Sequence, residues 1–397
     1  MLATSALGLL IFVDDGFNCL TIGSVMRPVT DRYKVSRAKL AYIIDATAAP
    51  VCIIAPVSSW AAAINSYVPE DAGISGFQLF LRTIPYNLYA LLTLFVVFFT
   101  SATLFDFGLM KKAQERADAG DLGAKGEEME QALVLHRKAG MIDMLLPMGV
   151  LIASAIGAMI YTGYLNGGRS LVDCFANCES AESLVFATLI TLIVIIVLYL
   201  IRHVLSLSEM MEIIPDGAKL MIPFMIILVL AWTLKGIINT LGAGVFIASI
   251  LDVDGSLVKL LPLLSYAVAV FFSFSSGTSW GTFAIMVPIV INLFAGSGNL
   301  TPMTISVAAV LAGAVCGDHI SPISDTTIMS SSGALCDHLE HARTQIQYQT
   351  PVVIASGVGF FIAGFAGNPG VPFVVSLVVL LLELAFIRLL QRRRDIG

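Results

Sequence analysis

Charged side chains are scarce in this sequence. Only 13% of its 397 residues are Asp, Glu, Lys or Arg, whereas 57% are hydrophobic, and the mean hydropathy is +0.89. Soluble domains carry about 25% charged residues, so the composition excludes an ordinary soluble globular protein of this length. It predicts an all-α, multi-span membrane protein. The net charge of −6 carries little information, because the positions of Lys and Arg set orientation.

Cysteine and catalytic motifs are also sparse. Cys19, Cys52 and Cys316 lie in apolar runs and are interpreted as small hydrophobic residues. Cys174 and Cys178 share a polar loop, where a disulfide or metal pair stays open. The sequence has no H-E-x-x-H motif and no nucleophile beside a base. We therefore predict no enzyme and no cofactor, and keep a membrane hydrolase using Asp318, His319 and His338 as a remote alternative.

Apolar segments of spanning length, about 20 residues each, recur along the chain. Two further segments, 1–29 and 257–291, are interrupted by the polar stretches DDGFN and SSGTSWGT. Interrupted helices are where transporters place their binding sites, because the freed backbone groups line a cavity. The continuous spans are predicted at 38–63, 77–103, 141–165, 184–204, 221–241, 302–328, 350–366 and 371–388.

The basic segments predict the orientation. RPVTDRYKVSRAK (27–39), the loop 104–140 and the C-terminal LLQRRRDIG contain most of the Lys and Arg residues, and basic loops favour the cytoplasmic side. A single topology places all three there, with the Cys174/Cys178 loop outside. We therefore predict a bacterial cytoplasmic membrane protein with a cytoplasmic C-terminus. The N-terminus lacks a basic region and a cleavage site, so we interpret it as membrane structure rather than a signal peptide.

A weak internal repeat relates the two halves. TIGSVMRPV (21–29) resembles GTFAIMVPI (281–289), and the loop after the first copy is basic whereas the loop after the second is uncharged. Opposite charge bias indicates two inverted repeats containing broken or re-entrant helices. Because two spans precede the second copy and none precedes the first, we expect helices to be missing upstream of Met1. The predicted units are 1–103 (first repeat), 104–140 (cytoplasmic helical connector), 141–256 (scaffold helices) and 257–397 (second repeat).

Five acids fall within apolar segments. A charged carboxylate at the bilayer centre costs about 2.5–3.5 kcal/mol on insertion scales, so such acids are functional candidates. They are Asp14, Asp15, Asp45, Asp318 and Asp325. The stretch GDHISPISDTT (317–327) also holds His319 and Pro322, and the proline predicts unwound backbone with free carbonyls. Carboxylate, hydroxyl and carbonyl oxygens suit a small hard cation.

The break SFSSGTSWGTF (273–283) supplies further hydroxyls, including Thr278 and Ser279. The N-terminus of a half-helix there could face an anion or a substrate carboxylate, while close packing of small residues is the structural alternative. His338 and His341, in CDHLEHARTQ, are interpreted as part of a cytoplasmic polar cap rather than as metal ligands.

Two long blocks resemble a known family. FVDDGFNCLTIGSVMRPVTDRYKVSRAKLAYIIDATAAPVCIIAPVSSW and GDHISPISDTTIMSSSGALCDHLEHARTQIQYQTP are similar to the NhaC-type Na+/H+ antiporter family, which includes malate–lactate antiporters. The likeness runs across nearly the whole chain. More distantly it resembles the ion-transporter superfamily, whose members use inverted repeats, re-entrant hairpins and an elevator-like motion, commonly as dimers. Relatives usually have apolar segments before the DD motif, where this chain has Met1.

The resemblance implies Na+ and H+ as the coupled ions. It maps ion-binding or transport roles onto Asp14, Asp15, Asn18, Thr21, Asp45, Thr47, Asp318, His319, Ser324, Asp325 and Thr326. We predict an antiporter in which a buried carboxylate binds either Na+ or a proton. Asp318 and Asp325 are the expected Na+ ligands or proton carriers, with Asp14, Asp15 and Asp45 contributing from the other repeat and His319 tuning the proton step.

The main alternative is an Na+- or H+-coupled exchanger of small carboxylates, with the break at Thr278 and Ser279 holding the organic anion. The resemblance further implies a homodimer in contact with membrane lipid. No feature of the sequence indicates a nucleic-acid partner.

Overall fold

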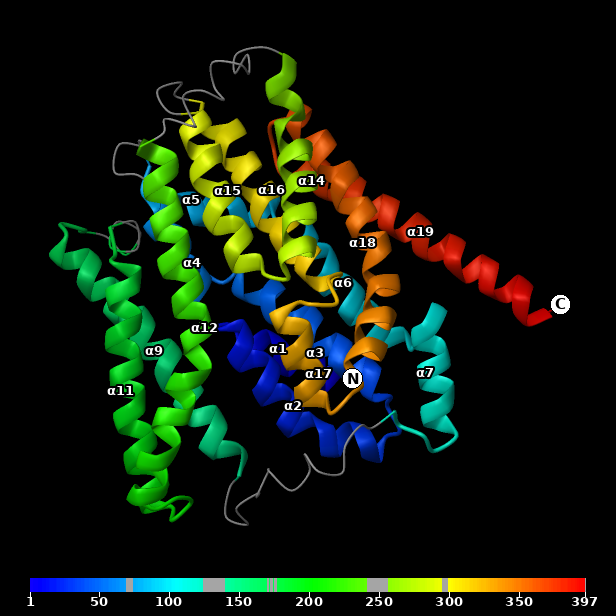
Figure 1. Ribbon diagram of the computed structural model, residues 1–397, viewed down its shortest axis with the longest axis horizontal. Coiled ribbons are helices and arrows are strands. Elements are labelled where there is room, and N and C mark those ends of the chain that lie inside the picture. The colour runs from blue at the N-terminus through cyan, green and yellow to red at the C-terminus, as the bar shows by residue number, and fades with distance from the viewer. Residues whose placement is uncertain are drawn as a thin grey trace.

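The computed structural model describes residues 1–68, 74–123, 140–169, 171, 174, 177–240, 256–294 and 299–396. Within these ranges the chain forms sixteen α-helices, two 3-10 helices and no strands, which confirms the all-α prediction (Figure 1). Seven helical stretches of the described residues are long and apolar enough to cross a membrane: Leu88–Asp118, Leu145–Leu165, Glu182–Ile201, Val258–Ser276, Leu300–His319, His338–Ala366 and Gly370–Arg392.

The helices of the N-terminal half are short and frequently interrupted. They are α1 (Leu2–Leu10), α2 (Asp15–Arg32), α3 (Arg37–Cys52), α4 (Ser59–Tyr67), α5 (Gly76–Thr83), η1 (Ile84–Tyr86), α6 (Leu88–Thr103) and α7 (Gly108–Asp118).

The C-terminal half contains longer helices around a second set of interruptions. They are α9 (Met141–Leu165), α11 (Ser180–Ile201), α12 (Leu207–Thr240), η2 (Ser256–Leu260), α14 (Leu261–Ser276), α15 (Ser279–Leu293), α16 (Leu300–His319), α17 (Asp325–Ala334), α18 (His338–Ala366) and α19 (Gly370–Ile396).

Both predicted interruptions are present. The polar stretch after α1 separates it from α2, and α14 ends at Gly277, whose φ of 68° lies in the left-handed region that favours glycine. For two spans, the prediction of a continuous helix is wrong. Segment 38–63 breaks between α3 and α4, and segment 302–328 breaks between α16 and α17. In each case a proline (Pro56, Pro322) removes a backbone donor and a serine begins a new helix by capping it.

Other predicted boundaries need smaller corrections. Segment 77–103 is divided by the 3-10 turn Ile84–Tyr86, where Pro85 lies at the start of the turn. The predicted helical connector 104–140 contains α7, and its residues 124–139 lie outside the described part. The six cysteines, including Cys174 and Cys178, are free in the structure.

Corresponding turns of the two halves lie at opposite edges of the structure. In Figure 1 the turn joining α2 to α3 lies at the lower edge, whereas α15 ends and α16 begins at the upper edge. Every residue of α3 is buried, and so is nearly all of α16, which makes these two the central helices. α9, α11 and α19 bury little of their surface inside the chain and form the periphery. This arrangement agrees with inverted repeats, although the predicted unit boundaries stay predictions.

Candidate functional site

Two pairs of broken helices cross near the centre of the chain, and the two crossings share one backbone pattern. In the first, the backbone N–H of Ser59 on α4 donates to the carbonyl of Val13, over 2.8 Å. In the second, the N–H of Asp325 on α17 donates to the carbonyl of Gly277, over 3.3 Å. Ser58 and Ser324 cap the helices that follow. Each crossing therefore joins the break of one helix to the start of another within the same half.

Asp318 lies beside the second crossing and is 1% exposed. Ser279 Oγ lies 2.8 Å from Asp318 Oδ2, and Thr326 Oγ1 lies 3.5 Å from it. Ser279 also reaches the carbonyl of Ala314 at 3.2 Å. Asp318 Oδ1 is buried without a hydrogen-bond partner. The centre thus contains hydroxyl and carbonyl oxygens around a carboxylate that still has one free oxygen.

Asp325 and Ser324 complete this centre from α17. Asp325 is half-buried at the first position of the helix, and its Oδ1 accepts from the backbone N–H of Thr326. Its charge interacts with those of Asp318 and Asp45. Ser324 caps α17 by accepting from the N–H of Thr327, and its hydroxyl lies 3.2 Å from Thr326 Oγ1. Among the described residues, no three His, Cys, Asp or Glu side chains are grouped as metal ligands.

Asp45 on α3 forms a second polar centre with residues of the other half. Its Oδ2 accepts from Thr327 Oγ1 at 3.1 Å and from the amide of Gln345, and it lies 3.3 Å from His341 Nε2. His319 Nε2 is 4.0 Å from Asp45 Oδ1, while His319 Nδ1 is 3.0 Å from Tyr89 Oη. The side chains of Asp45, His319 and His341 are fully buried.

Asp14 and Asp15 lie at the first crossing. Asp14 caps α2 by accepting from the N–H of Phe17 and lies 3.2 Å from Ser59 Oγ. Asp15 is 2% exposed, and its charge interacts with those of Asp14 and Asp325. Asn18 donates to the carbonyls of Gly8 and Ile11 at the end of α1. Asn18 therefore holds the broken helix together rather than pointing at the acids.

Three further predicted residues make no contact with the buried acids. The hydroxyl of Thr47 donates to the carbonyls of Ile43 and Ile44 in its own helix. Thr21 lines a cavity of about 610 Å³ between α2, α9 and α11, which also contains Asp14. Thr278 precedes α15 but its hydroxyl makes no capping bond and is buried without a partner.

That cavity ends near a salt bridge outside the spans. Asp143 pairs with Arg202, whose Nε lies 2.5 Å from Asp143 Oδ1. Burial alone would raise the pKa of Asp143, but hydrogen bonds from Arg202 and from the Gly140 N–H, together with the Arg202 charge, hold that pKa below its usual value.

Three residues of the site were not predicted from the sequence. His341 was assigned to a polar cap, and this is wrong, because its ring is buried against Asp45. Gln345 and Tyr89 were not singled out at all. One signal was available: His341, Gln345 and Tyr348 recur at helical spacing on one face of α18, where polar side chains would meet the buried helix α3.

A helical membrane protein with two sets of broken helices and buried acids at their crossings has the architecture of a secondary transporter. A model of the Na+/H+ antiporter family matches residues 51–365. The chain belongs to this family and is a multi-pass membrane antiporter.

Three proteins are similar to this chain in sequence. A protein of Haemophilus influenzae described only as uncharacterized is 35% identical over 96% of this chain and 74% of its own length. The malate-2H(+)/Na(+)-lactate antiporter of Bacillus subtilis is 34% identical over 23% of this chain and 19% of its own length. The arginine/ornithine antiporter ArcD of Halobacterium salinarum is 30% identical over 28% of the chain and 22% of its own length. No solved structure matches the chain significantly.

Proposed function

We propose that this antiporter exchanges Na+ for H+ across the bacterial cytoplasmic membrane. The observation that carries the proposal is the free oxygen of Asp318. A buried carboxylate oxygen without a partner is costly, and the cost is removed when a cation or a proton binds there. The family to which the chain belongs points to Na+ and H+ as these two occupants.

The neighbouring oxygens suit a hard cation. Ser279 Oγ and Thr326 Oγ1 lie around Asp318, and Asp325 adds a second carboxylate at the start of α17. Oxygen ligands of this kind favour a small hard cation over a soft one. Na+ would therefore be held by Asp318, Asp325, Ser279 and Thr326, while a proton would neutralise Asp318 directly. Since the two occupants exclude one another, binding of Na+ on one side releases a proton there.

The test is Na+-driven proton movement in proteoliposomes with a pH-sensitive dye inside. We expect an Na+ gradient to move protons in the wild type, and we expect Asp318→Asn and Asp325→Asn to reduce this flux to the level of empty vesicles. Asp216→Asn is the matched control, because Asp216 is exposed and forms an ion pair with Lys219. Wild-type flux in both site variants, or no flux in the wild type, would refute the proposal.

A second candidate is an exchanger of small carboxylates coupled to Na+ or H+. One observation favours it: the Thr278 hydroxyl is unpartnered at the start of α15, where backbone N–H groups attract anions. The similarity to a malate–lactate antiporter covers only part of the chain. Adding malate or lactate to the same vesicles separates the two candidates, since flux that requires the organic acid would establish the exchanger.

We further propose that the C-terminus is cytoplasmic and that the protein is a homodimer in the lipid bilayer. The clustering of Lys and Arg in 27–39, 104–140 and the C-terminal segment supports the orientation. Labelling of a cysteine added after Gly397 with a membrane-impermeant reagent in intact cells would contradict it. Mass photometry of the purified protein would test the dimer.

A further inference from the structure

The two oxygens of Asp45 have very different surroundings. Oδ2 is approached by three donors, from Thr327, Gln345 and His341, whereas Oδ1 is buried without a partner. Several hydrogen bonds to one carboxylate favour its ionised form. Asp45 is therefore built to stay an anion, unlike Asp318, which has fewer donors and no imidazole beside it.

The geometry of the His341 ring leaves one nitrogen available. Its Nε2 faces Asp45 Oδ2 at 3.3 Å and Ser330 Oγ at 3.0 Å. The carboxylate can only accept, and the Ser330 hydroxyl lies 3.2 Å from the carbonyl of Thr327, to which it donates. Nε2 must then hold the hydrogen in the neutral ring. The remaining Nδ1 has a free lone pair and is buried without a partner.

His319 has a different arrangement. Its Nδ1 lies 3.0 Å from Tyr89 Oη, and its Nε2, 4.0 Å from Asp45 Oδ1, is buried without a hydrogen-bond partner. In His319 the nitrogen that faces Asp45 is therefore the unpartnered one, whereas in His341 the nitrogen that faces Asp45 holds the hydrogen and the other nitrogen is unpartnered. The titratable groups that face His341 are Asp45 from α3 and His319 from α16. From α17 its contact is the Ser330 hydroxyl, and the nearby charge of α7, Arg116, pairs with Glu340 on the outer face of α18.

Resting on the Na+/H+ exchange proposed above, we propose that His341 Nδ1 binds a second transported proton, so that the protein moves more than one proton for each Na+. The proton bonds to the Nδ1 lone pair and converts the imidazole into an imidazolium. The ionised Asp45 balances that charge through Nε2–H. The exchange is then electrogenic, because a second positive charge crosses the membrane against each Na+.

One short segment links the two centres. Thr326 contacts Asp318 and the next residue, Thr327, contacts Asp45. Likewise, Asp318 belongs to the centre with Ser279 and Thr326, whereas its neighbour His319 belongs to the Asp45 centre. When Na+ draws Thr326 toward itself, the adjacent Thr327 must move relative to Asp45. Loss of that donor changes the pairing of Asp45 with His341, which is how Na+ binding would release the second proton.

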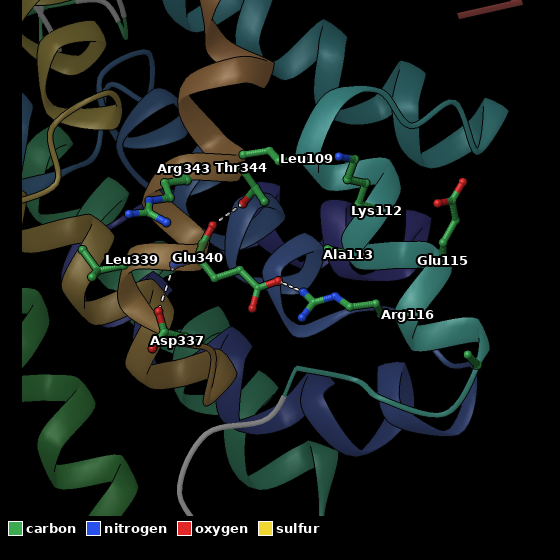
Figure 2. Close-up of a pocket in the computed structure, with 11 residues that line it drawn as sticks. Leu109, Lys112, Ala113, Glu115, Arg116, Asp337, Leu339, Glu340, Arg343 and Thr344 are labelled. Carbon is green, nitrogen blue, oxygen red and sulfur yellow. Dashed lines mark hydrogen bonds and ion pairs between the residues drawn. The ribbon is translucent and has the colours of Figure 1, made fainter. Parts of the chain in front are cut away.

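A cavity offers access to the turn that carries His341. It has a volume of about 910 Å³ and lies between α7 and the beginning of α18, where Asp337, Glu340 and Thr344 line it (Figure 2). Arg116 of α7 points at Glu340 across this cavity, and the two form an ion pair. Thr344 Oγ1 is 2.9 Å from the carbonyl of His341, so the cavity reaches within one helical turn of the ring.

The test is the response of exchange to membrane voltage. A K+ diffusion potential is imposed with valinomycin on proteoliposomes, and Na+/H+ exchange is followed at equal pH on both sides. We expect the wild type to be accelerated by a potential of the favourable sign and slowed by the opposite one. We expect His341→Gln to exchange Na+ for H+ with little response to voltage, because its amide can still donate to Asp45 but has no nitrogen that takes up a proton. His203→Gln, remote from the site, should behave as the wild type.

The outcomes separate the two proposals. A wild type that shows no Na+-driven proton movement refutes the exchange itself. A wild type that exchanges without responding to voltage, or a His341→Gln variant that keeps the wild-type response, overturns the second proton. A merely structural role for His341 would lower the rate and leave the voltage response unchanged.

If His341→Gln fails to fold, the wild type labelled with 15N-histidine decides instead. Na+-induced infrared difference spectra should show loss of an imidazolium band. A difference spectrum without this loss would overturn the proposal.

Discussion

The two helix crossings share a backbone plan but differ in where their acids lie. The first has Asp14 and Asp15 at the start of α2 and a serine, Ser59, at the start of α4. The second reverses this, with Ser279 at the start of α15 and Asp325 at the start of α17. The two crossings thus have similar backbone hydrogen bonds, but it is the second that adjoins Asp318 and, through α17, the Asp45 centre.

The surroundings of the crossings differ as well. Asp14 opens to the cavity between α2, α9 and α11, whereas Asp318 is enclosed by α14, α15 and α16. A charge near a cavity is better solvated and interacts more weakly than an enclosed one. We therefore propose that the second crossing selects the ion and that the first attracts it electrostatically.

Gly277→Ala should have the largest effect. The φ of 68° disfavours any residue with a Cβ, by about 1–2 kcal/mol, and an added Cβ would lie 2.4 Å from the carbonyl oxygen of Ile323. Because the second crossing has no room at this point, we expect a clearly lower melting temperature in detergent and loss of transport. Gly16→Ala is the control at the first crossing, where the nearest atoms lie 3.4 Å away. Equal melting temperatures of the two variants would contradict the conclusion that the second crossing is more closely packed than the first.

Asp14→Asn should have an intermediate effect. Asparagine caps helices as well as aspartate does, so the stability should not change while one negative charge is lost. Charges near a protein surface interact by about 1–2 kcal/mol at several ångströms, and we expect the KM for Na+ to rise by about tenfold or less. Flux measured over a range of Na+ concentrations checks this. Complete loss of flux, as expected for Asp325→Asn, would place a primary site at the first crossing.

The paired variants Ser58→Ala and Ser324→Ala should each cost about 1 kcal/mol of stability, since each removes one helix cap. Their effects on transport should differ. Ser324 also contacts Thr326 beside Asp318, so Ser324→Ala should raise the KM for Na+, whereas Ser58 bonds only to backbone around its own turn. Thermal unfolding and KM measured on both variants test this, and an equal rise in KM would mean that the crossings act alike.

The sequence predicts the class of fold and most of the acids, but not how they pair. Polar stretches such as DDGFN and SSGTSWGT interrupt apolar runs visibly, and both breaks are present. The break after α3 was missed because its only polar residues, Ser58 and Ser59, sit in an otherwise apolar run. Asp45 and Gln345 are 300 residues apart in sequence, so their contact depends on the packing of α3 against α18. His341 was also missed, because the charged residues around it in the sequence indicated an exposed segment, whereas its ring is buried against Asp45.

Thr47→Val should have the smallest effect, although the family resemblance maps an ion-binding role onto this residue. Its hydroxyl donates only to carbonyls one turn back in α3, and such bonds contribute little to a helix. We expect stability within about 0.5 kcal/mol of the wild type and an unchanged KM for Na+. Thr327→Val makes the same chemical change at a hydroxyl that donates to Asp45, and it should impair exchange. Matching defects in the two variants would show that Thr47 turns toward the ions during the transport cycle, and that the two centres extend further into the first half than its contacts indicate.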